Sequence, residues 1–133
     1  MAFDPTRLLI LVDELSVLQD RVRAAKQTGD WLAVERELSD GYALMGVARR
    51  RLGIEAPAVV RKHLGHGDLV RALAELLAQE SDLLRLEGDP DSAATSARWT
   101  LQLLLHGAPP GDYSALTRPL LALAERRPPP EPL

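Results

Sequence analysis

The stretch Thr28-Gly29-Asp30-Trp31 decides the fold, because it ends one helix and begins the next within a few residues. Glycine readily adopts the left-handed conformation that closes a helix. An aspartate that precedes a helix accepts the free N–H groups of its first turn. The Gly-Asp pair occurs three more times, and Asp-Pro marks two starts, at Gly67-Asp68, Gly88-Asp89, Gly111-Asp112, Asp4-Pro5 and Asp89-Pro90. These signals predict helix starts near residues 5, 31, 69, 90 and 113.

Between these turns the apolar residues recur every three or four positions, which is typical of helices. The clearest stripe runs from Leu8 through Leu15 to Val22. In the second helix, Trp31 is expected to lie in the core, and Asp68 is expected to cap the helix that follows it. Pro119 is expected to kink or split the last helix. The expected helices are 5–27, 31–52, 57–64, 69–86, 90–106 and a last one from about 113.

Composition supports a helical, water-soluble protein. The 133 residues include 26 Leu and 18 Ala but only five aromatic side chains, and this balance favours helices over strands. The absence of cysteine excludes disulfides and thiolate metal sites. The longest apolar run, 8–12, is too short to cross a membrane. A net charge of −3 is untypical of a general nucleic-acid binder, and we expect a cytoplasmic protein without a cofactor.

The expected fold class is all-α, with two antiparallel helical hairpins, 5–27 with 31–52 and 69–86 with 90–106. Tight turns make the helices of each hairpin neighbours. A short middle helix, 57–64, would join the hairpins, and the helix from 113 would cap the exposed end. The single domain would span 1–127. The proline-rich tail 128–133 cannot be helical and is expected to be polyproline-like and frayed.

The two hairpin turns and the helices that follow them resemble the tetratricopeptide repeat (TPR). That family places a glycine, an aromatic, an alanine, a large residue and a small residue at fixed spacing. The matching positions are Gly29, Trp31, Val34, Leu38 and Gly41 in the first copy and Gly88, Pro90, Ala93, Ala97 and Thr100 in the second. The copies lie 59 residues apart, so the chain is similar to degenerate TPR-like proteins of small bacterial families. The resemblance implies a scaffold that binds a peptide or protein; a plain helical bundle with the same turns is the alternative.

Two features point to an interaction surface or an internal contact. Trp99 and Leu103 lie four residues apart, off the apolar stripe of Ala93, Ala97, Leu101 and Leu104, so the helix 90–106 is apolar on two sides. It is either sandwiched between its neighbours or meets a second subunit in a homodimer. Glu80 falls beside the apolar stripe of its helix, and we expect it to pair with an arginine across the hairpin.

Two further hypotheses come from other classes of protein. Arg49, Arg50 and Arg51, with Arg61 and Lys62, could contact phosphates in a nucleic-acid-associated regulator. The group His63, His66 and Asp68 has the residue types of a zinc or iron site and would define a metal-dependent enzyme. Its glycine-rich spacing favours a plain loop. The expected function is therefore non-catalytic binding of a peptide or protein in a groove between the hairpins.

Overall fold

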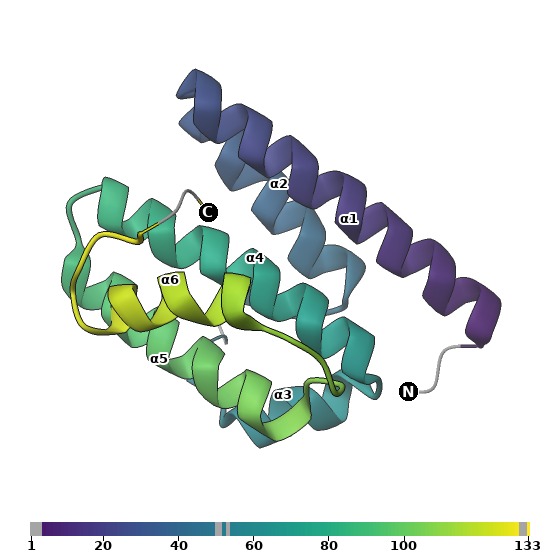
Figure 1. Cartoon of the computed structure of the whole chain (residues 1–133). Coiled ribbons are helices and arrows are strands. Elements are labelled where there is room, and N and C mark those ends of the chain that lie inside the picture. The colour runs from purple at the N-terminus through teal and green to yellow at the C-terminus, as the bar shows by residue number, and fades with distance from the viewer. Residues whose placement is uncertain (1–3, 50–51, 53, 131–132) are drawn as a thin grey trace.

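The computed structural model describes residues 4–49, 52, 54–130 and 133. Over these residues it contains six helices and no strand (Figure 1), which confirms the all-α prediction. None of the helices in the described part of the chain has the length and apolar character needed to traverse a bilayer. The helices are α1 (Pro5–Thr28), α2 (Trp31–Leu44), α3 (Pro57–Leu64), α4 (Gly67–Leu86), α5 (Pro90–Gly107) and α6 (Ser114–Ala124).

Three helices begin where the aspartates predicted. The carboxylates of Asp4, Asp30 and Asp89 each accept the backbone N–H three residues further on. This contact satisfies one of the N–H groups that a helix leaves free in its first turn. Gly29, with φ 72°, and Gly88, with φ 86°, provide the left-handed residues after α1 and α4. The Gly-Asp signal is therefore confirmed at both of these turns.

The end of α2 and the start of α4 differ from the prediction, because the local sequence pattern does not determine them. The prediction of a helix over 31–52 is wrong at its end, because α2 stops at Leu44. Gly46, with φ 68°, turns the chain there, and the N–H of Val47 returns to the carbonyl of Tyr42. The predicted cap Asp68 lies instead inside the first turn of α4, and the ring of His66 accepts the Asp68 N–H. α6 is one helix that includes Pro119, so the proline does not split it.

α4 is the central helix and contacts each of the other five. Figure 1 shows α1 and α2 on one side of it and α5 and α6 on the other. A helix in this position must be apolar on several faces, and eleven of its residues are buried. Small side chains let α5 approach closely, since the Ser81 hydroxyl donates to the Ser96 hydroxyl at 2.7 Å.

The core contains the predicted stripe of α1 and most of the predicted face of α2. Leu11, Leu15, Leu18 and Val22 are buried, as are Val34, Leu38, Tyr42 and Met45. The prediction for Trp31 is wrong, because 43% of this residue is exposed. Trp31 is the first residue of α2 and borders a cavity that Lys26 and Gln27 of α1 also line.

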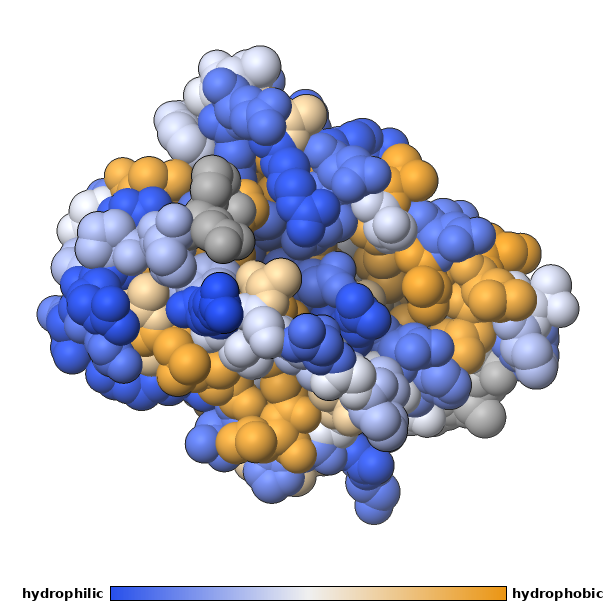
Figure 2. Space-filling model, viewed as in Figure 1, coloured by the Kyte–Doolittle hydropathy of each residue, from blue (hydrophilic) through white to orange (hydrophobic). Residues whose placement is uncertain are grey.

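Apolar side chains also lie on the outside of the molecule. Leu9, Ile10 and Val17 of α1 are exposed, together with Leu44 at the end of α2. Figure 2 shows a broad apolar region on the right of the view, where Figure 1 places the first half of α1. The hydrophobic surface of this protein is therefore spread over more than one helix.

Candidate interaction groove

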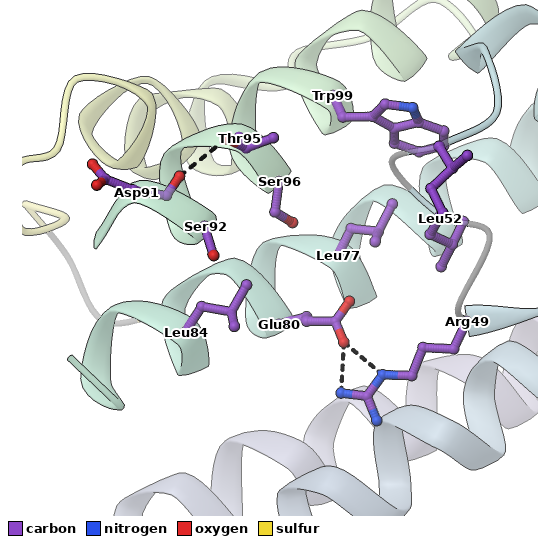
Figure 3. Close-up of a pocket in the computed structure, with 11 residues that line it drawn as sticks. Arg49, Leu52, Leu77, Glu80, Leu84, Asp91, Ser92, Thr95, Ser96 and Trp99 are labelled. Atoms are coloured by element: carbon purple, nitrogen blue, oxygen red, sulfur yellow. Dashed lines mark hydrogen bonds and ion pairs between the residues drawn. The ribbon is translucent and has the colours of Figure 1, made fainter. Parts of the chain in front are cut away.

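A groove of about 550 Å³ opens between α4, α5 and the connection that follows α2 (Figure 3). Its lining has three chemical parts: an apolar part, a row of hydroxyl groups on α5, and a few charged groups. The apolar part is Leu52, Ile54, Leu77, Leu84 and Trp99; the hydroxyl row is Ser92, Thr95 and Ser96; the charged groups are Arg49, Glu80 and Asp91. Such a mixture of apolar surface and a few polar groups is typical of a binding site.

Trp99 is held in place at the wall of this groove. Its indole N–H donates to the main-chain oxygen of Glu55 at 2.8 Å, which ties α5 to the segment before α3. The residue is half-buried, and Figure 3 shows its ring beside Leu52. An aromatic side chain fixed in this way contributes contact area at a small cost in conformational entropy.

Of the predicted interaction surface of Trp99 and Leu103, only Trp99 is accessible. Leu103 is 0% exposed and belongs to the main core. α5 contacts α4 and α6, as the sandwich hypothesis expects, and it also contacts α3. An accessible face of α5 would therefore have to include Trp99 without Leu103.

Glu80 and Arg49 form the centre of an ionic network at one end of the groove. The Arg49 Nε donates to Glu80 at 2.6 Å, and another of its nitrogens lies 2.8 Å from Glu35. The Ser39 hydroxyl accepts a further Arg49 hydrogen bond at 3.0 Å. Glu80 also accepts the Tyr42 hydroxyl at 3.1 Å. The expectation that Glu80 pairs with an arginine is thus confirmed. The partner does not lie across the predicted hairpin 69–86 with 90–106, because Arg49 belongs to the segment after α2, which the pair joins to α4.

This network shifts the pKa of two of its members. Burial raises the pKa of the Tyr42 hydroxyl well above its ordinary value, and the charge of Glu80 raises it further. Burial alone would lower the pKa of Arg49, but the hydrogen bond to Glu35 and the charge of Glu80 outweigh it and raise the pKa. Tyr42 therefore stays neutral and Arg49 stays charged at any physiological pH.

Of the three consecutive arginines in the nucleic-acid hypothesis, the structure describes only Arg49. Arg50 and Arg51 lie outside the described residues. Arg49 is matched by two carboxylates, so it offers no uncompensated charge to phosphate. Arg61 lies with its stem against Gly107, where an added β-carbon would be 2.5 Å from its Cγ. Lys62 follows it on the exposed last turn of α3.

The residues of the metal hypothesis have separate contacts. His63 lies 3.1 Å from the carbonyl oxygen of Gly46, and His66 caps α4. The ring nitrogen of His66 and the carboxylate of Asp68 are 3.7 Å apart. Among the residues that the structure describes, no three histidine or acidic side chains are grouped closely enough to hold a metal ion. The geometry therefore adds nothing to the metal-enzyme hypothesis.

A second polar cluster, between α1 and α4, was missed by the sequence analysis. The Lys26 ammonium donates to Asp82 at 2.6 Å and to Gln79 at 2.8 Å, and all three side chains are largely buried. Arg85 binds the other oxygen of Asp82. The available signal was the presence of Gln79 and Asp82 between apolar residues on a helix that is buried on several sides.

Comparisons with known protein families, with curated proteins and with solved structures gave no match. The function must therefore be argued from the grooves and their chemistry.

Proposed function

We propose that this protein is a non-catalytic, TPR-like interaction module that binds a peptide segment of a partner protein in the groove of Figure 3. The observation that carries the proposal is the position of Trp99, fixed through Glu55 beside open space. Aromatic side chains held at the wall of a groove are typical anchors for a partner's apolar side chain. The proposal includes a cytoplasmic location and needs no cofactor.

The lining suggests the chemistry of the ligand. Ile54 is 81% exposed and stands at the edge of the apolar part. The hydroxyls of Ser92 and Thr95 line the groove on α5. The Thr95 hydroxyl donates to the main-chain oxygen of Asp91, so its oxygen can accept a peptide N–H. These features fit a short segment with at least one large apolar side chain next to an accessible main chain.

The charged groups of the lining favour a neutral segment. Arg49 is bound by Glu80 and Glu35, and Asp91 adds another carboxylate to the lining. Among the described residues these charges are paired with one another, and Asp91 is also bound by Arg126 at 2.7 Å. A neutral segment therefore fits the described lining best.

Selection of peptides from a random displayed library, followed by affinity measurement on two variants, tests the proposal. Thr95→Arg places a long charged side chain in the groove, whereas Ser16→Arg makes a similar change on the exposed face of α1. We expect the selected peptides to contain a large apolar residue. They should lose at least tenfold in affinity for Thr95→Arg and bind Ser16→Arg like the original chain. Equal binding to both variants would reject this groove as the site.

A further inference from the structure

A second groove lies on the other side of α4, between α1 and α4, and α6 borders only its smaller part. It consists of two cavities of about 310 Å³ and 860 Å³, and Leu133 lines both of them. Figure 1 shows the chain after α6 turning back across α4 towards α1. Of the described tail residues, Pro129, Pro130 and Leu133 line this groove.

Leu133, the last described residue of this segment, is docked rather than frayed, whereas Pro128 and Pro130 are exposed. Leu133 packs against the apolar cluster that includes Leu120 and Leu123. Its main-chain oxygen accepts a hydrogen bond from the Lys26 ammonium at 3.2 Å. Because an ammonium has three N–H groups, Asp82, Gln79 and Leu133 together satisfy Lys26.

The charges of the larger cavity favour an oxygen atom at that position. Among the described residues, Arg23, Lys26 and Arg85 line it together with one carboxylate, that of Asp82. Arg23 also lies 3.4 Å from Asp20 on its own helix. Asp82 is already shared between Lys26 and Arg85. The remaining positive charge attracts a carbonyl or carboxylate oxygen, which is what segment 128–133 supplies.

The smaller cavity has a buried acceptor without a donor. Gln19 is 5% exposed and lines this cavity, and its amide nitrogen donates to the main-chain oxygen of Glu75. Its side-chain oxygen has no hydrogen-bond partner. Leaving such an oxygen unpaired in the interior is costly. A peptide N–H arriving in the cavity would satisfy it, while Lys26 binds a carbonyl of the same segment.

The far end of the groove has a surface suited to prolines. Trp31 and Leu86, both exposed, line the larger cavity together with Pro129 and Pro130. Proline-rich segments are extended before binding and dock on surfaces that contain aromatic residues. Trp31 was predicted to lie in the core. Its exposure places an aromatic ring where a proline-rich segment could dock.

From these contacts we propose that the groove between α1 and α4 is a docking site for an extended, proline-containing segment of a partner protein. Segment 128–133 occupies the site in cis and competes with the partner. The partner segment has prolines followed by a large aliphatic residue, as this chain has at Pro128, Pro129, Pro130 and Leu133. The site is separate from the groove of Figure 3 and does not depend on the function proposed for it.

Competition of this kind has a measurable consequence. A tethered segment has an effective concentration in the millimolar range, so it masks its site against a free ligand of moderate affinity. A substitution that weakens the tethered segment must therefore strengthen the binding of the free one.

The probe is a fluorescent hexapeptide with the sequence of residues 128–133 and blocked ends, titrated with the full chain and followed by anisotropy. We expect Leu133→Ser, which removes the aliphatic anchor, to bind this peptide at least tenfold more tightly than the original chain. Adding Trp31→Ala to Leu133→Ser should reverse that gain. Adding Leu32→Ala, a matched change at a neighbouring exposed position, should preserve it.

Two results would overturn the proposal: an unchanged affinity in Leu133→Ser, or full binding by the variant that also carries Trp31→Ala. Circular dichroism of every variant checks that the helices are intact. Thr95→Arg in the Leu133→Ser background should still bind the hexapeptide, since Thr95 lines the other groove. Loss of binding in that variant would contradict the separation of the two sites.

Discussion

Gly41 of α2 and Leu76 of α4 approach each other so closely that no side chain fits between them. A β-carbon on Gly41 would lie 2.6 Å from Cδ1 of Leu76 and 3.3 Å from Cδ2 of Leu18. Both leucines are almost completely buried, so neither can turn towards solvent. The small residue that the TPR-like pattern places at position 41 therefore lies at a contact between three helices.

Gly41→Ala is expected to destabilise the protein by about 1–2 kcal/mol. Alanine gains about 1 kcal/mol over glycine in helix propensity, but overpacking a tight core costs about 1–3 kcal/mol, and the fixed leucines place the cost at the upper end. Urea unfolding of Gly41→Ala, Leu76→Ala and the double variant provides the measurement. Leu76→Ala should cost less in the Gly41→Ala background, because it removes the clash. Additive effects would contradict the close contact.

Arg49 is expected to contribute to stability through Glu80 rather than through solvent-exposed charge. Arg49→Met should lower the free energy of unfolding by about 1–3 kcal/mol, because it leaves Glu80 partly buried without its cation. The range lies below that of a fully buried pair, since 31% of the Arg49 side chain is exposed. Glu80→Gln should reduce the effect of Arg49→Met in a double-mutant cycle. The control Arg36→Met, at an exposed position of α2, should change stability by less than about 0.5 kcal/mol.

Tyr42 is expected to make stability fall at high pH. Its pKa is raised above the ordinary value of 10.0 by burial and then by Glu80. The unfolded chain therefore releases this proton at a lower pH than the folded chain, so folding loses stability as the pH rises above about 10. Below that pH, Tyr42→Phe should be less stable by about 1–2 kcal/mol, because Glu80 loses a hydrogen bond. Urea midpoints from pH 7 to 11 should show this difference shrinking above pH 10; a constant difference would contradict the raised pKa.

The sequence could predict the helices wherever the deciding contacts are local. An aspartate cap such as Asp30 bonds to an N–H only three residues away, and these predictions are confirmed. The end of α2 is different, because both Gly46 and Gly53 are suitable terminators. The chain turns at Gly46, where Met45 is buried and Val47 packs against the core. Which glycine ends the helix therefore depended on packing that the local sequence does not contain.

In the candidate sites, too, local contacts could be predicted from the sequence and long-range contacts could not. A glutamate beside an apolar stripe predicted an arginine partner for Glu80, but Arg49 could be chosen only once α2 was known to end early. Lys26 and Asp82 are 56 residues apart, and no periodicity connects them. Trp31 continues the apolar stripe of α2, so its exposure could not be read from spacing. It became evident only from the packing, which leaves the first residue of α2 at the edge of a cavity.

Asp89, the N-cap of α5, is expected to make the stability of the protein depend on pH in the acid range, and Asp89→Ala should remove this dependence. Hydrogen bonds from Ser92 lower the pKa of the Asp89 carboxyl in the folded chain. A carboxyl with a lowered pKa stabilises folding above its unfolded pKa of about 3.9, and the stabilisation is lost as the pH falls through the folded value. Asp89→Ala should therefore lower the melting temperature at pH 7, and the difference from the original chain should diminish below pH 4.

Asp89→Asn separates the charge of this residue from its hydrogen bond. Asparagine is about as good a cap as aspartate but does not titrate. At pH 7 it should keep most of the melting temperature that Asp89→Ala loses, because its side-chain oxygen still accepts the Ser92 N–H. Between pH 5 and pH 2 the original chain should lose more stability than Asp89→Asn, since only the aspartate takes up a proton. Parallel melting curves for the two proteins over this range would show that the carboxylate charge contributes nothing and that the hydrogen bond alone begins α5.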